Sequence, residues 1–74
     1  MAAWALKVFV EGRWKHLGEF ESLNAAEEYA KLRFPQQAFK RLEAADGGFR
    51  LQGTPQAPEA GSIECGVWNQ ARHR

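Results

Sequence analysis

The stretch Phe20–Phe34, FESLNAAEEYAKLRF, has the clearest structural pattern in the chain. Its apolar side chains recur at the spacing of one helical face, with charged side chains opposite. The apolar set is Leu23, Ala26, Ala30 and Phe34, with Tyr29 beside them. Ser22 or Asn24 can cap the start, because each side-chain oxygen can accept from unpaired backbone N–H groups. Pro35 disfavours helical geometry at the preceding residue. The sequence therefore predicts one amphipathic helix that ends there.

Length and composition limit what surrounds this helix. A chain of 74 residues makes one domain, in which folding buries roughly 60% of the unfolded surface. One cysteine excludes an intramolecular disulfide and is typical of a reducing cytosol, so we expect a cytoplasmic protein. No apolar run approaches the roughly 20 residues of a membrane span, and no signal peptide is present. Ten basic and nine acidic residues give no general attraction to nucleic acid or acidic lipid.

Two strands are predicted before the helix. In Trp4–Val10 one face has Trp4, Leu6, Val8 and Val10, the inward set, and the other has Ala5, Lys7 and Phe9. Arg13–Phe20 follows after Glu11-Gly12. A three-residue loop, residues 10–12, would place Trp14, His16, Gly18 and Phe20 on the inner face. A two-residue turn would instead bring Arg13 and Lys15 inward and move Trp14 and Phe20 outward. Burial of the large aromatics favours the first register.

Three strands are predicted after the helix. Gln37–Ala45 has an inward set of Ala38, Leu42 and Ala44 with Phe39 and Arg41 outside, although the opposite parity stays open. A turn at residues 46–48 leads into Phe49–Gln52, with Phe49 and Leu51 inward. Residues 53–61 form a mobile loop or an extended connection. Ser62–Asn69 is the last strand, with Ile63, Cys65 and Val67 inward and Glu64 and Trp68 outward. Residues 70–74 form a basic tail that is expected to fray.

The sum is an α+β domain spanning residues 1–74. Its order is strand-strand-helix-strand-strand-strand, with an antiparallel sheet of four to five strands and one helix across one face. A single helix cannot cover both faces of a sheet, so the other face must meet water or a partner. Basic and aromatic residues are expected to alternate on that open face. The candidate binding residues are Lys7, Phe9, Arg13, Lys15, Leu17, Arg41, Arg50 and Trp68, with Phe39 a further possibility.

Residues capable of catalysis or metal binding occur without the neighbours they would need. His16 and His73 have no Cys, Asp or Glu at a metal-ligand spacing. Cys65 shares the parity of Ile63 and Val67, which favours a packed thiol over a nucleophile. The adjacent Glu27 and Glu28 diverge on the helix and make a poor acid–base pair. We therefore expect no enzyme activity, no metal and no cofactor.

A short stretch resembles a known family. Residues 17–22, LGEFES, followed by Ala25-Ala26 and Tyr29-Ala30, are similar to the strand-to-helix junction of plant ethylene-response-type and integrase arm-binding DNA-binding domains. The resemblance covers about a fifth of the chain and implies recognition of the DNA major groove by arginine and tryptophan on an open sheet face. The size and shape also resemble small phage or mobile-element accessory proteins, including anti-CRISPR inhibitors that dock on larger assemblies.

Two functions follow from the predicted open face. The favoured one is a non-enzymatic module, an inhibitor or adaptor, that docks on a larger protein, since aromatic residues and arginine dominate binding hot spots. The alternative is a nucleic-acid-binding domain, in which Lys and Arg pair with phosphates while Phe9 or Trp68 stacks on bases. A homodimer through this face or an edge strand is also possible. No membrane partner is expected.

Overall fold

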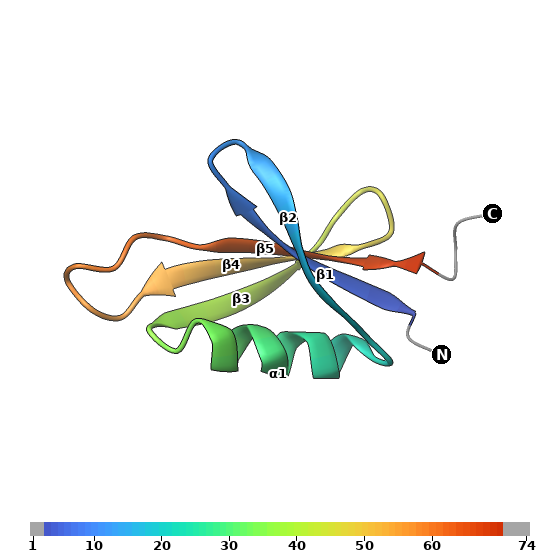
Figure 1. Ribbon diagram of the computed structural model, residues 1–74, viewed down its shortest axis with the longest axis horizontal. Coiled ribbons are helices and arrows are strands. Elements are labelled where there is room, and N and C mark those ends of the chain that lie inside the picture. Colours follow the sequence, from blue (N-terminus) through green and yellow to red (C-terminus); the bar gives the residue numbers. More distant parts are fainter. Residues whose placement is uncertain (1–2, 71–74) are drawn as a thin grey trace.

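A computed structural model describes residues 3–70. The elements are β1 (Trp4–Val10), β2 (Arg13–Phe20), α1 (Leu23–Arg33), β3 (Gln37–Glu43), β4 (Phe49–Pro55) and β5 (Glu64–Asn69). The strands form one antiparallel sheet in the order β2-β1-β5-β4-β3, and α1 lies across one face (Figure 1). The predicted α+β fold is confirmed. Residues 71–74 of the expected frayed tail, which include His73, lie outside the described range.

The helix begins and ends where its capping residues predict. Ser22 has an extended backbone, and its hydroxyl oxygen accepts a 3.0 Å hydrogen bond from the Ala25 N–H. Ser22, rather than Asn24, is therefore the N-cap. At the other end, the Phe34 N–H still bonds to the Ala30 carbonyl at 2.9 Å before Pro35 redirects the chain. No helix in the described part of the chain combines the length and apolar character that crossing a membrane requires.

The core lies between α1 and the sheet. Two helix residues, Ala26 and Ala30, are fully buried, and their small side chains let the helix approach the strands closely. The sheet supplies the larger buried side chains, which are Leu6, Val8, Leu51, Cys65 and Val67. Burying one leucine or valine of this kind contributes about 1.5–3 kcal/mol. The inward parity predicted for β1, β4 and β5 is confirmed.

The β1–β2 hairpin has a different register from the predicted one. Glu11 and Gly12 alone form the turn, both with positive φ (52° and 81°), and Phe9 lies opposite Trp14. This geometry is typical of the two-residue turns that best match strand twist. The three-residue loop is therefore wrong. Trp14 and His16 lie on the face away from the helix, because they share the parity of Phe9 and Lys7.

A β-bulge then restores the inward direction for the rest of β2. Leu6 lies opposite Gly18 whereas Lys7 lies opposite His16, so Leu17 is an extra residue in the ladder. Past this point Phe20 faces the helix as predicted, and its ring lies 5.2 Å from that of Tyr29. Neither predicted register therefore holds along the whole strand. Leu17 itself packs against the core rather than facing outward.

Strand β3 has the alternative parity, with Phe39 and Arg41 on the helix side. Phe39 packs against the core, with its ring 6.5 Å from that of Phe34. Arg41 shares this side, and its Nη1 lies 3.6 Å from Glu27 Oε1 on the helix. The inward set of Ala38, Leu42 and Ala44 is wrong for Ala38 and Leu42, which pair with residues of the open face.

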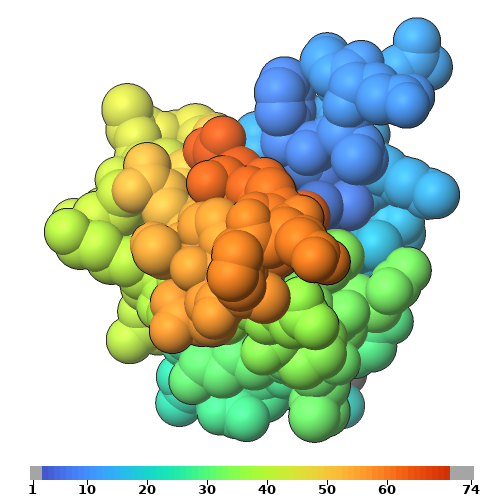
Figure 2. Space-filling view, turned by 90° about the vertical axis from the view of Figure 1, so that its left-hand side faces the viewer, coloured from blue at the N-terminus to red at the C-terminus, as the bar shows by residue number. Residues whose placement is uncertain are grey.

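The connection after β4 is tied to β3. The Gln37 side chain donates to the Gly61 carbonyl at 2.7 Å and accepts from the Ile63 N–H at 3.2 Å. β4 itself runs to Pro55, three residues further than the predicted strand. Of the two alternatives predicted for residues 53–61, a mobile loop or an extended connection, the extended one is correct for residues 53–55. Figure 2 shows the connection in orange beside the projecting blue hairpin.

Candidate binding site on the open face

The face away from α1 has a compact group of aromatic and basic side chains. Strands β1, β2, β4 and β5 each contribute to it. We call this group the open-face cluster, and its members are Lys7, Phe9, Trp14, Arg50 and Trp68. Side chains that are distant in sequence meet here because β5 lies between β1 and β4 in the sheet.

Three aromatic rings of the cluster pack against one another in a row. The Phe9 and Trp14 rings pack edge to face, with centroids 5.0 Å apart. Trp14 in turn meets Trp68 at 5.1 Å with an interplanar angle of 85°. Edge-to-face pairs at such distances contribute about 0.5–1.5 kcal/mol each beyond their buried area. The three rings therefore hold one another in fixed positions on the surface.

Two cations flank the rings. The Arg50 guanidinium lies 4.5 Å from the Trp68 ring centroid and 5.5 Å from that of Trp14. The Lys7 ammonium lies 5.3 Å from the Trp68 ring. Cation–π contacts at partly exposed sites contribute about 0.5–1 kcal/mol. Trp68 thus has a cation from each neighbouring strand.

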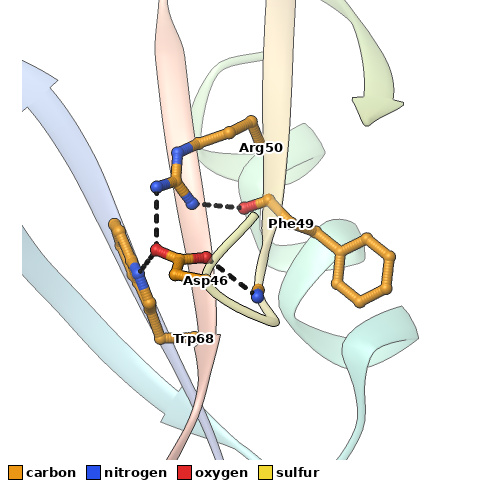
Figure 3. A network of polar contacts seen from close by, with 5 residues as sticks. Asp46, Phe49, Arg50 and Trp68 are labelled. Carbon is orange, nitrogen blue, oxygen red and sulfur yellow. Dashed lines mark hydrogen bonds and ion pairs between the residues drawn. The ribbon is translucent and has the colours of Figure 1, made fainter. Parts of the chain in front are cut away.

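Asp46, in the turn between β3 and β4, fixes two of these side chains (Figure 3). Its Oδ2 accepts a 2.8 Å hydrogen bond from Trp68 Nε1 and lies 3.2 Å from Arg50 Nη2. Its Oδ1 accepts from the Gly48 N–H at 3.0 Å. The Gly48 hydrogen bond, followed by those from Trp68 and Arg50, lowers the pKa of Asp46 to about 2. The carboxylate is therefore ionised at neutral pH and offsets the charge of Arg50.

The absence of a side chain at Gly66 lets the Trp68 ring lie across its own strand. A Cβ at position 66 would fall 2.4 Å from Trp68 Cη2, a distance that no real contact allows. Gly66 pairs with Lys7 on one side and Arg50 on the other, so the ring occupies the space between the two cations. The cluster therefore depends on this glycine as much as on its aromatic residues.

The structure brings together four of the eight predicted site residues: Lys7, Phe9, Arg50 and Trp68. The other four lie on the helix-bearing side, which corrects their predicted placement. Arg13 and Lys15 move there because of the two-residue turn, Leu17 because of the bulge, and Arg41 because of the parity of β3. Arg13 and Lys15 remain exposed.

Sequence reasoning missed two members of the site. The predicted three-residue loop directs Trp14 inward, although two-residue turns are the commoner hairpin connection and Gly12 suits a position with positive φ. For Asp46 the sequence predicts only a place in a turn. Its contact with Trp68 spans 22 residues, and no local pattern predicts such a contact.

The charge of the open face is balanced. In the described residues its cations are Lys7, Lys40 and Arg50, and its carboxylates are Glu19, Glu64 and the turn residue Asp46. His16 shares this face and lies 4.0 Å from Glu19. A phosphate backbone would therefore meet as many carboxylates as cations here, which disfavours strong electrostatic attraction.

The search for metal-binding groups and the comparisons with known proteins add no functional assignment to the site. Among residues 3–70, no group of three or more His, Cys, Asp or Glu side chains is placed to hold a metal ion. No family model, no curated protein and no solved structure matches the chain.

Proposed function

We propose that the protein is a small non-enzymatic binding module that docks on a larger protein through its open sheet face, as an inhibitor or adaptor. The observation that carries this proposal is the open-face cluster, which the single helix leaves uncovered. Tryptophan and arginine are the residues most enriched at the energetic centres of protein interfaces. Here they lie together at the middle of one face.

The fixed geometry of the cluster favours binding. A side chain that is ordered before association loses less conformational entropy when a partner covers it. Trp68 is held by the Asp46 carboxylate and by its position over Gly66, and Trp14 is held by the two rings beside it. The cluster therefore resembles a preorganised anchor rather than a set of mobile surface side chains.

The balanced charge of the face favours a protein over nucleic acid as the partner. Arg50 is paired with Asp46, and three of the basic residues expected to contact phosphates lie on the other side of the sheet. Nucleic-acid binding, the alternative function, would have to depend mainly on Lys7 and Lys40.

We also propose that the protein is an inhibitor or adaptor of phage or mobile-element origin. We further propose a cytoplasmic location, since the free thiol of Cys65 is typical of a reducing compartment.

Affinity capture with matched variants tests the proposal. Immobilised protein is exposed to a lysate of the source organism, with and without nuclease and at two salt concentrations. We expect a nuclease-resistant protein to be retained by wild type and lost with Lys7→Glu and Phe9→Ala. The matched controls Lys31→Glu and Leu32→Ala, on the exposed side of α1, should retain it.

Two results would contradict docking through this face. One is retained material that disappears on nuclease treatment and falls steeply with salt, which would establish the nucleic-acid alternative. The other is equal loss of the partner with the helix controls. Far-ultraviolet circular dichroism of every variant separates these outcomes from unfolding.

A further inference from the structure

A groove opens at the hairpin end of the open face, beside the cluster. Its volume is about 420 Å³, and it lies between Phe9 of β1 and the point where β4 and β5 separate. Gln52 and Glu64 form the last pair of that ladder, and Thr54 and Ser62 continue the two walls. Figure 2 shows this end of the molecule, with the blue hairpin beside the orange connection.

The groove has a carboxylate without a counter-ion. Glu64 is exposed and makes no ion pair within residues 3–70. Lys7 projects from the same face of the neighbouring strand, but its ammonium lies over the Trp68 ring. Glu64 therefore presents its negative charge to the solvent in the groove.

An aromatic ring lies directly across from this carboxylate. Phe9 pairs with Glu64 in the β1–β5 ladder and is 41% exposed, which makes it one of the most exposed large apolar residues in the described chain. The remaining lining includes hydrogen-bond acceptors. The side chains of Gln52, Thr54 and Ser62 make no hydrogen bond to other described residues.

We propose that this groove is a subsite for a basic side chain of the docking partner, an arginine in first place. The inference rests on the proposed function and names the chemistry of one partner contact. A guanidinium can stack on the Phe9 ring and direct its N–H donors at Glu64 and the neighbouring hydroxyl and amide oxygens. An acidic side chain or a phosphate would be repelled by the unpaired carboxylate.

A small-molecule titration tests the subsite without the partner. The probe is N-acetyl-arginine methylamide, added to the full-length ¹⁵N-labelled protein, and the neutral citrulline analogue is the matched ligand control. We expect saturable shifts at the amides of Phe9, Thr54 and Glu64 with the arginine probe only. Glu64→Gln should weaken binding by about three- to fivefold, as for an exposed ion pair. Phe9→Leu, which keeps an apolar side chain, should weaken it by about two- to fivefold.

Glu19→Gln is the matched protein control, because Glu19 lies on the same face outside the groove. It should leave the titration unchanged. Equal shifts with the citrulline analogue, or equal weakening by Glu19→Gln, would overturn the proposal. Shifts of the same amides on simple dilution would assign the groove to a second copy of the chain and overturn it too. Because no partner is present, a failed titration removes only the subsite, whereas failed capture removes the docking function.

Discussion

The indole N–H of Trp68 donates a 2.8 Å hydrogen bond to the carboxylate of Asp46, which lies 22 residues earlier in the chain. The bond joins the turn between β3 and β4 to the last strand of the sheet. It holds the Trp68 ring over Gly66, in contact with Trp14. The shape of the open face therefore depends on one exposed carboxylate in a turn.

Asp46→Asn should lower the unfolding temperature at neutral pH and remove part of its pH dependence. The pKa of Asp46 is about 2 in the folded protein, below its ordinary value of 3.8. Ionised Asp46 therefore contributes stability above pH 3.8, and this contribution is lost as the pH falls towards 2. Thermal unfolding followed by circular dichroism should show wild type and variant converging across that interval. A difference that stays constant across the interval would contradict the assignment.

Gly66→Ala should displace Trp68. The added Cβ would meet three atoms of the Trp68 ring, the nearest at 2.4 Å, so the ring must leave its position. We expect a loss of about 1–3 kcal/mol in the free energy of unfolding and an altered near-ultraviolet circular dichroism spectrum. Gly61→Ala is the matched control, since a Cβ there meets nothing within 4 Å. An unchanged tryptophan spectrum for Gly66→Ala would show that the ring does not lie over residue 66.

Glu11→Asn should stabilise the hairpin. Glu11 has a φ of 52°, in the left-handed region that costs most side chains about 1–2 kcal/mol and that asparagine tolerates better. Asn-Gly is also the preferred pair for this turn. Chemical denaturation should show a gain of up to about 1 kcal/mol. A loss of stability would favour the three-residue loop at residues 10–12 that the sequence pattern predicts.

The double substitution Arg13→Glu, Lys15→Glu should leave partner binding almost unchanged. Both residues lie on the helix-bearing side of β2, opposite the open-face cluster. We expect the dissociation constant of the captured protein to change by less than about threefold, the range of exposed charges remote from an interface centre. Titration calorimetry measures this directly. A loss of binding comparable to that of Lys7→Glu would move the interface to the hairpin tip.

The helix and the order of elements could be predicted from sequence because their signals are local. Ser22 caps the helix, Pro35 stops it, and the apolar stripe has the right period. The register of the β1–β2 hairpin could not be predicted, because two irregularities have opposite effects on which side chains of β2 face the helix. The two-residue turn reverses the parity of β2, and the bulge at Leu17 reverses it again before Phe20.

The parity of β3 failed for a different reason. Apolar side chains occupy both parities of QAFKRLE, and the choice is made by tertiary contacts. Phe39 fills space beside Phe34, and Arg41 reaches Glu27 of the helix. Four of the five members of the open-face cluster followed from alternation in β1, β4 and β5. The rest depends on Trp14 and Asp46, whose positions are set by a turn geometry and a contact between distant residues.

Site-directed photo-cross-linking tests most directly whether the open face is the docking surface. A photoreactive amino acid replaces Lys40, an exposed open-face residue outside the cluster, or, in a matched variant, Lys31 on the exposed side of α1. Each protein is irradiated in a lysate of the source organism. We predict a discrete, nuclease-resistant protein adduct from position 40 and none from position 31. An adduct from position 31 alone, or only a nucleic-acid adduct from position 40, would contradict protein docking on the open face.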